Sequence, residues 1–195
     1  MTGTMLDYFR EALAAGRKPA ECQKSLDNLL FQDRPTLTAT LELFLDSPDE
    51  DWRREACVQI SSDIPELVPR VRELLRADPR VRVRAAAAST LGEASTWPDS
   101  ALLDSVEQDP EEEVRVVAFV ASLRSAGVPE SIADREFELC LEGKSHPSRA
   151  HIEALILSSK TETRQVTRLE FFREALAGGR TLEECGDALQ ELLYQ

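Results

Sequence analysis

The sequence is short of aromatic residues and glycine, and no segment shows the strict alternation of apolar and polar residues that marks a strand. Among its 195 residues are only two tyrosines, two tryptophans, eight glycines and ten prolines. Alanine, leucine, arginine and glutamate are abundant instead, and these residues lose little conformational freedom in a helix. The composition therefore predicts an all-α protein.

Long apolar runs are also missing. No run approaches the length of a transmembrane span, and the N-terminal residues MTGTMLDYFREA lack the basic-then-apolar pattern of a secretion signal. We therefore expect a cytoplasmic protein that has no membrane partner.

Positive charge is in short supply. The chain has 23 lysines and arginines against 36 aspartates and glutamates, which gives a net charge of −13. Because nucleic-acid affinity depends largely on cations that face phosphates, this charge argues against a DNA or RNA partner. The charge is uneven, with a balance of +4 over residues 70–84 and of −9 over residues 99–142. Such segments are solvated helix faces or docking surfaces for a charged partner, and the first reading is favoured.

The residue patterns of catalytic and metal sites are absent as well. The four cysteines, at positions 22, 57, 140 and 185, are too scattered for a CxxC motif. His146 and His151 are five residues apart, which places them on different faces of a helix, and no HExxH, GxSxG, Walker or GxGxxG motif occurs. We therefore predict no catalytic residue, no cofactor and no metal ligand.

What the sequence does contain is a period of 31 residues in its central part. Three prolines at this spacing each precede an apolar-periodic run: Pro48, Pro79 and Pro110. The residue before each proline is of a type that caps helices, and proline suits the first helical position. These predicted caps are Ser47, Asp78 and Asp109, and Glu50 would complete a capping box with Ser47. Shorter amphipathic stretches lie between the runs, so each period holds two helices, which is the signature of an α-solenoid.

The most regular run, DPRVRVRAAAASTLGEA at residues 78–94, resembles the HEAT repeat in its short bacterial form, often compared with phycobilisome lyases. The residues that fit this pattern are Val83, Arg84, Ala86, Ala87, Leu91 and Gly92. The resemblance covers residues 35–160, with less regular repeats around the central one. It implies a superhelix of antiparallel helical hairpins, and members of the family are mostly binding scaffolds rather than enzymes.

The resemblance also implies a structural role for an arginine that follows each proline by five residues. Such an arginine bonds to the preceding aspartate turn or to the neighbouring repeat, and so ties the stack together. A basic ladder for an anionic ligand is the less favoured reading. The expected inter-repeat ladder has three arginines and three acceptors: Arg53, Arg84, Arg115, Asp46, Asp78 and Asp109.

The two ends of the chain are near copies of each other. Slid by 163 positions, residues 4–32 and 167–195 match at 16 of 29 positions. Each copy predicts a helical hairpin, with helices near residues 4–15 and 19–31 in the first. In each copy an i, i+4, i+7, i+8 pattern predicts one buried stripe: Cys22, Leu26, Leu29 and Leu30, or Cys185, Leu189, Leu192 and Leu193. With terminal hairpins at 4–32 and 165–195, the α-solenoid has about six HEAT-like hairpins in a single domain of residues 1–195.

Three explanations for the copies stay open. The hairpin is a module that binds a common partner or its own twin, or it joins units of an array, or it is a relic of duplication without a present role. Capping of the stack alone does not explain the similarity, because the two ends of a solenoid expose opposite sides. We favour the first explanation, which includes self-association through the terminal hairpins.

The function that we favour from the sequence is a non-enzymatic scaffold that binds another protein on the concave face of the stack. That face is made by the inner helices, which begin at Asp49, Arg80, Glu111 and Ser148. The candidate partner-binding residues are Arg54, Arg80, Arg82, Trp97, Glu111 and Glu112. One alternative is an acidic inhibitor or immunity-type protein that neutralises a basic enzyme. Another is a HEAT-like DNA glycosylase or a bilin-lyase-like enzyme, and the net charge of −13 disfavours the glycosylase.

Overall fold

A computed structural model describes residues 4–60, 64–95 and 98–159 of the chain. Throughout these ranges every regular element is a helix, as the composition predicts. The chain divides into two compact units, residues 1–152 and residues 153–195. In the second unit the described residues, 153–159, are helical. The predicted C-terminal hairpin at 165–195 lies outside the described residues.

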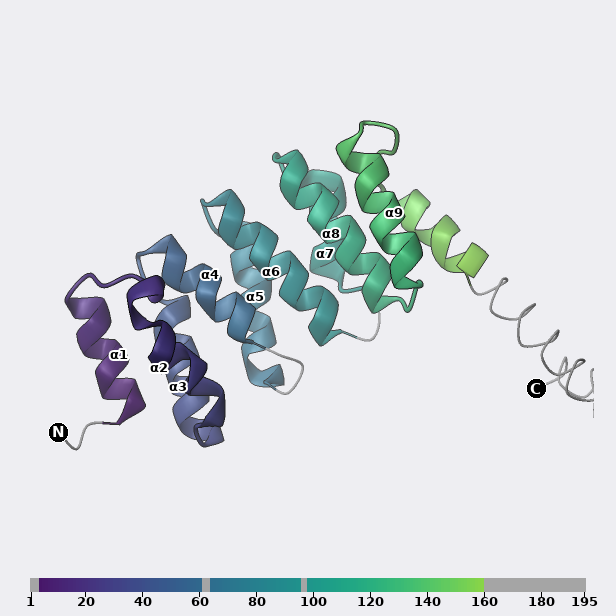
Figure 1. Ribbon diagram of the computed structural model, residues 1–195. Helices are drawn as coiled ribbons and strands as arrows, with labels where there is room; N and C mark the ends of the chain where they lie inside the picture. The colour runs from purple at the N-terminus through teal and green to yellow at the C-terminus, as the bar shows by residue number, and fades with distance from the viewer. Residues whose placement is uncertain (1–3, 61–63, 96–97, 160–195) are drawn as a thin grey trace, which may run out of the picture. The chain divides into compact units, whose positions relative to one another are not determined.

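The first unit is an all-α solenoid of antiparallel hairpins. Three hairpins follow one another: α3 (Arg34–Leu45) with α4 (Glu50–Gln59), α5 (Val68–Ala77) with α6 (Val81–Ala94), and α7 (Ser100–Gln108) with α8 (Glu112–Ser125). The second helix of each hairpin packs against its equivalents, so that α6 lies between α4 and α8 (Figure 1). The first helices form the row behind them, where α5 contacts α7. Helix α9 (Glu130–Leu141) packs on α8 and continues the series.

The N-terminal segment forms only part of the expected hairpin. Helix α1 (Met5–Ala14) is capped by Thr4, and Gly16 turns the chain with a φ of 68°. The predicted second helix is instead a series of short pieces: η1 (Pro19–Cys22), α2 (Gln23–Asp27) and η2 (Leu29–Phe31). The predicted buried stripe is therefore wrong at Leu30, which is 56% exposed. A 3₁₀ turn has three residues per turn, which rotates this side chain away from the face of Leu26.

The predicted capping residues close proline turns and do not cap the helices, whereas the helix starts predicted at Asp49, Arg80 and Glu111 are the N-cap residues of α4, α6 and α8. Helices α4, α6 and α8 begin three residues after the predicted caps, so each proline lies in the turn and not at the first helical position. Each predicted cap side chain accepts the N–H two residues later: Ser47 from Asp49, Asp78 from Arg80, and Asp109 from Glu111, at 3.2, 2.9 and 3.0 Å. Aspartate and serine close turns in this way, and a residue before proline avoids the helical conformation. The capping box between Ser47 and Glu50 is accordingly not formed, and Asp49 caps α4.

Small side chains bring α6 and α8 close together. Ala87, Ala88 and Leu91 of α6 are fully buried. A Cβ atom built on Gly92 would lie 2.7 Å from the Cβ of Ala121 in α8 and 2.9 Å from its carbonyl oxygen. The glycine of the Leu-Gly pair is therefore required by the close approach of the two helices.

We predict that Gly92→Ala lowers the free energy of unfolding by about 1–3 kcal/mol, because the added methyl group overlaps backbone atoms of Ala121. Helix propensity alone would change stability by about 1 kcal/mol in the opposite direction. Urea unfolding of the full chain measures the difference. Ser89→Ala, at an exposed position of the same helix, is the matched control and should change stability by less than about 0.5 kcal/mol. A Gly92→Ala protein as stable as the control would contradict this account of the helix contact.

Candidate functional site

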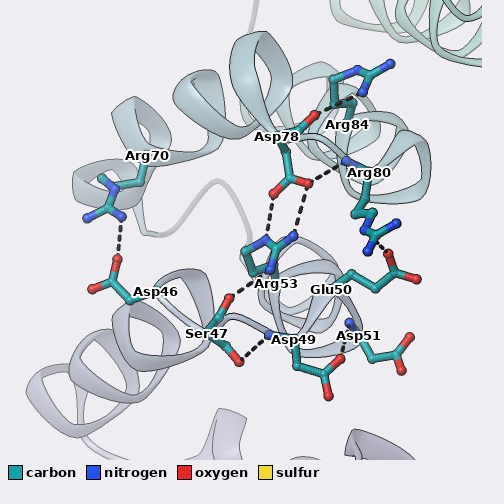
Figure 2. A network of polar contacts seen from close by, with 10 residues as sticks. All are labelled: Asp46, Ser47, Asp49, Glu50, Asp51, Arg53, Arg70, Asp78, Arg80 and Arg84. Atoms are coloured by element: carbon teal, nitrogen blue, oxygen red, sulfur yellow. Dashed lines mark hydrogen bonds and ion pairs between the residues drawn. The ribbon is translucent and has the colours of Figure 1, made fainter.

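Two buried ion pairs connect consecutive repeats. The Nε and Nη2 atoms of Arg53 in α4 donate to the two carboxylate oxygens of Asp78 at 2.6 and 3.1 Å (Figure 2). Arg84 in α6 makes the same bidentate contact with Asp109 at 2.8 and 2.9 Å. The four side chains are only 3–11% exposed. Each arginine therefore reaches forward to the proline turn of the following repeat.

The remaining guanidinium nitrogen binds the turn of the same repeat. Nη1 of Arg53 donates to the carbonyl of Ser47 at 2.8 Å, and Nη1 of Arg84 donates to the carbonyl of Asp78 at 2.9 Å (Figure 2). The bond to the neighbouring carboxylate raises the pKa of both arginines. One planar cation thus fixes its own turn and the next one, and the rigid fork of arginine suits this bidentate geometry.

The acceptors differ from the expected set at one position. Asp46 accepts no bond from Arg53; its carboxylate lies 2.6 Å from Nη2 of Arg70, and both side chains are well exposed. The 31-residue period places Ser47, and not Asp46, at the position of Asp78, and serine contributes only its carbonyl and hydroxyl.

Arg115 is the third predicted member of the ladder. Its Nη1 atom donates to the carbonyls of Asp109 and Pro110 at 2.7 and 3.1 Å. No ion pair of Arg115 is found in the described part of the chain. The position 31 residues after Asp109 is Cys140, which offers no carboxylate, because the following repeat is six residues longer.

Hollows of about 480 and 300 Å³ lie beside the two bridges and are lined by equivalent residues one period apart. Arg53 and Asp78 line the first, and Arg84 and Asp109 line the second. Because these guanidinium groups are already paired with carboxylates, the hollows gain no net positive charge from the bridges. The arrangement does not favour the reading as a basic ladder for an anionic ligand.

The candidate partner-binding residues fall into separate groups. Arg54 of α4 and Arg82 of α6 are exposed, and neither forms an ion pair with a residue that the structure describes. Arg80 is also exposed, but its Nε lies 3.0 Å from Glu50 of the preceding repeat (Figure 2). The acidic pair at the start of α8, Glu111 and Glu112, is exposed and lies one repeat further along the stack. Trp97 lies outside the described residues.

Several contacts between segments were not expected from the sequence. Arg72 and Asp99 pair at 2.7 Å, with the carboxylate 5% exposed. Arg34 binds Glu66 through two bonds and holds the pKa of that carboxyl at about 2. These pairs follow no shared spacing, so sequence periodicity could not reveal them. The sequence analysis also did not identify Val58 as a candidate partner-binding residue, although this side chain is 68% exposed and lies one turn after Arg54 on the same helix.

The described residues contain no metal-binding cluster. Within them, no cluster of three or more histidine, cysteine, aspartate or glutamate side chains could hold a metal ion. Burial raises the pKa of the Cys57 thiol to about 12, so its reactive thiolate is scarce at neutral pH. Among the helices of the described ranges, none has the length and apolar character needed to cross a membrane.

Comparison with known proteins identifies the repeats. Residues 37–131 match the family model for HEAT repeats, a span that contains both buried bridges and the contact at Gly92. No curated protein and no solved structure matches the chain.

We predict that Arg84→Ala lowers the free energy of unfolding by about 3–5 kcal/mol, because it leaves the buried Asp109 carboxylate without its cation. Arg70→Ala is the matched control, since it removes an exposed arginine–aspartate pair and should cost about 1 kcal/mol or less. Urea unfolding monitored by circular dichroism measures both. Equal losses in the two variants would show that the buried bridge has no special role in stability.

Proposed function

We propose that this HEAT-repeat protein is a non-enzymatic scaffold that binds another protein through the exposed side of α4 and α6. The observation that carries the proposal is a pair of exposed arginines without ion-pair partners in the described residues, on two helices that pack side by side. Stacked repeats present extended surfaces of this kind, because each repeat uses its other faces to contact its neighbours.

The docking face, defined as Arg54, Val58, Arg82 and Ser89, combines charge with an apolar contact. Arg54 and Val58 are one turn apart in α4, on the side opposite the buried Trp52 and Ala56. Arg82 and Ser89 are two turns apart in α6, and both are exposed. Arginines are enriched at the centres of protein interfaces, where they bind carboxylates in a fixed geometry.

The chemistry of this face favours a partner segment that carries carboxylates beside an apolar side chain. Most of the arginines that the structure describes form ion pairs with neighbouring acids, as Arg53, Arg70 and Arg84 do. Arginines that form no ion pair within the described residues do not have to break one when a carboxylate approaches, and they help to orient the partner.

We predict that the double substitution Arg54→Glu and Arg82→Glu lowers capture of the partner by about tenfold or more, because two attractive charges become repulsive. The full chain, immobilised, is exposed to a lysate of its own source cells, and bound proteins are quantified by mass spectrometry.

The control is Arg70→Glu with Arg76→Glu, which makes the same change of charge on exposed residues of α5, in the other row of helices. This variant should retain the same bound proteins. If both variants lost the same amount of captured partner, net charge would explain the loss and the docking face would not be supported. Unchanged capture by the Arg54→Glu, Arg82→Glu variant would contradict the proposal.

The acidic inhibitor is the second candidate function, because residues 99–142 carry a balance of −9 and Glu111 and Glu112 are exposed. Acidic residues at the first turn of α8 also favour the helix itself, so their presence alone is weak support. A basic enzyme as the captured protein, released by Glu111→Lys and Glu112→Lys but retained by the arginine variants, would favour this function over the scaffold.

A further inference from the structure

The N-terminal segment 4–32 packs on an aromatic docking surface of the first hairpin, formed by Phe44 of α3 and Trp52 of α4. Phe9 of α1 is completely buried there, with its ring centroid 4.9 Å from that of Phe44 and 5.8 Å from that of Trp52. The indole Nε1 of Trp52 donates to the backbone carbonyl of Arg17 at 2.9 Å. The segment is therefore held by a buried aromatic cluster and by one bond to its backbone.

Residues 167–195 reproduce the residues that segment 4–32 buries. Six residues of segment 4–32 are buried, and five of them have the identical residue 163 positions later: Phe9, Ala12, Cys22, Leu26 and Leu29 correspond to Phe172, Ala175, Cys185, Leu189 and Leu192. The sixth, Pro19, is replaced by another apolar residue, Leu182. Arg17, whose carbonyl binds the indole, corresponds to Arg180.

The two segments differ mainly where segment 4–32 is exposed. Exposed Lys24 and Asn28, for example, are replaced by Asp187 and Glu191. One replaced residue, Lys18, forms ion pairs with the first hairpin, because its Nζ lies 2.7 Å from Asp49 and 3.2 Å from Asp51. Thr181 stands in its place. A matching sequence at buried positions and a different one at exposed positions indicates that both segments suit the same apolar surface.

We infer that the aromatic docking surface of one chain takes residues 167–195 of a second copy in exchange for its own segment 4–32. Phe172 then replaces Phe9 against Phe44 and Trp52, and the carbonyl of Arg180 replaces that of Arg17. Exchange of this kind costs little, because the aromatic contacts and the backbone bond are replaced by equivalent ones. The surface and the entering segment belong to opposite ends of the chain, so the contact is head-to-tail and generates rings or open chains.

The structure favours occupation by segment 4–32 when a chain is alone. This segment is joined directly to the first hairpin, which gives it a high effective concentration, and Lys18 adds its ion pairs to Asp49 and Asp51. Its release does not remove the cap of α3, because the helix is capped by its own Asp33, which accepts from the N–H of Thr36 at 3.1 Å. Exchange therefore increases with protein concentration and with any change that weakens the binding of segment 4–32 to the docking surface.

Sedimentation velocity of the full chain over a series of concentrations tests the inference. Phe9→Ala removes the central ring of the first copy and should strengthen self-association by about tenfold or more. Lys18→Thr, which gives the first copy the residue found in the second, should strengthen association by a few fold. This exposed substitution preserves the fold, and circular dichroism verifies it for both variants.

Adding Phe172→Ala to either variant should abolish the gained association. Tyr194→Ala is the matched control, since it removes an aromatic ring from the same segment at the position of Phe31, which is 84% exposed. Association that survives Phe172→Ala, or variants that stay monomeric at all concentrations, would overturn the inference. The inference would also be overturned if Phe172→Ala lowered the stability of these variants equally at all protein concentrations. Residues 167–195 of the same chain would then occupy the aromatic docking surface.

The inference does not depend on the docking face of α4 and α6. Arg54→Glu with Arg82→Glu should leave self-association unchanged, whereas it should impair partner capture. Failure of one proposal is thus distinguishable from failure of the other.

Discussion

The bidentate bond between the arginine of one repeat and the aspartate of the next is the interaction on which the central stack depends. Arg53 and Arg84 each donate to a carboxylate 25 residues ahead and to a carbonyl six residues behind. Each aspartate in turn closes its proline turn by accepting an N–H two residues later. Orientation of the next helix is thereby linked to that of the previous one, and the buried charges satisfy each other.

Close packing of small residues between α6 and α8, near the C-terminal end of α6, complements these bridges. Gly92 lies so close to Ala121 that an added Cβ atom would overlap it, and the hydroxyl of Thr90 donates to the carbonyl of Cys57 in α4 at 2.7 Å. These bridges, the Thr90 bond and the backbone approach all lie at junctions between neighbouring repeats. Arg54, Val58, Arg82 and Ser89 of the docking face take part in none of them.

The fold was largely predictable from the sequence, because a 31-residue period with proline turns and Ala-rich runs specifies stacked hairpins. The starts of the inner helices were predicted to within one residue, but the predicted capping residues were wrong. A side chain before proline can either cap a helix or close a turn, and only the backbone geometry decides between them. The sequence did not show which way each arginine reaches along the stack. Arg84 could equally have bound the carboxylate of Asp78 in its own repeat, and spacing does not say which repeat supplies the carboxylate. The sequence named Arg54 and Arg82 as candidates but could not show that they form no ion pair within the described residues, because partners such as Glu50 for Arg80 come from other repeats.

The central claim is that the forward bridge couples consecutive repeats, and a double-mutant cycle on Arg84 and Asp109 tests it most directly. Arg84→Ala, Asp109→Ala and the double variant are compared with the original protein by urea unfolding of the full chain. The account predicts a coupling free energy of about 2 kcal/mol or more, with the double variant losing much less than the sum of the single losses. Additivity of the two single losses to within about 0.5 kcal/mol would contradict it.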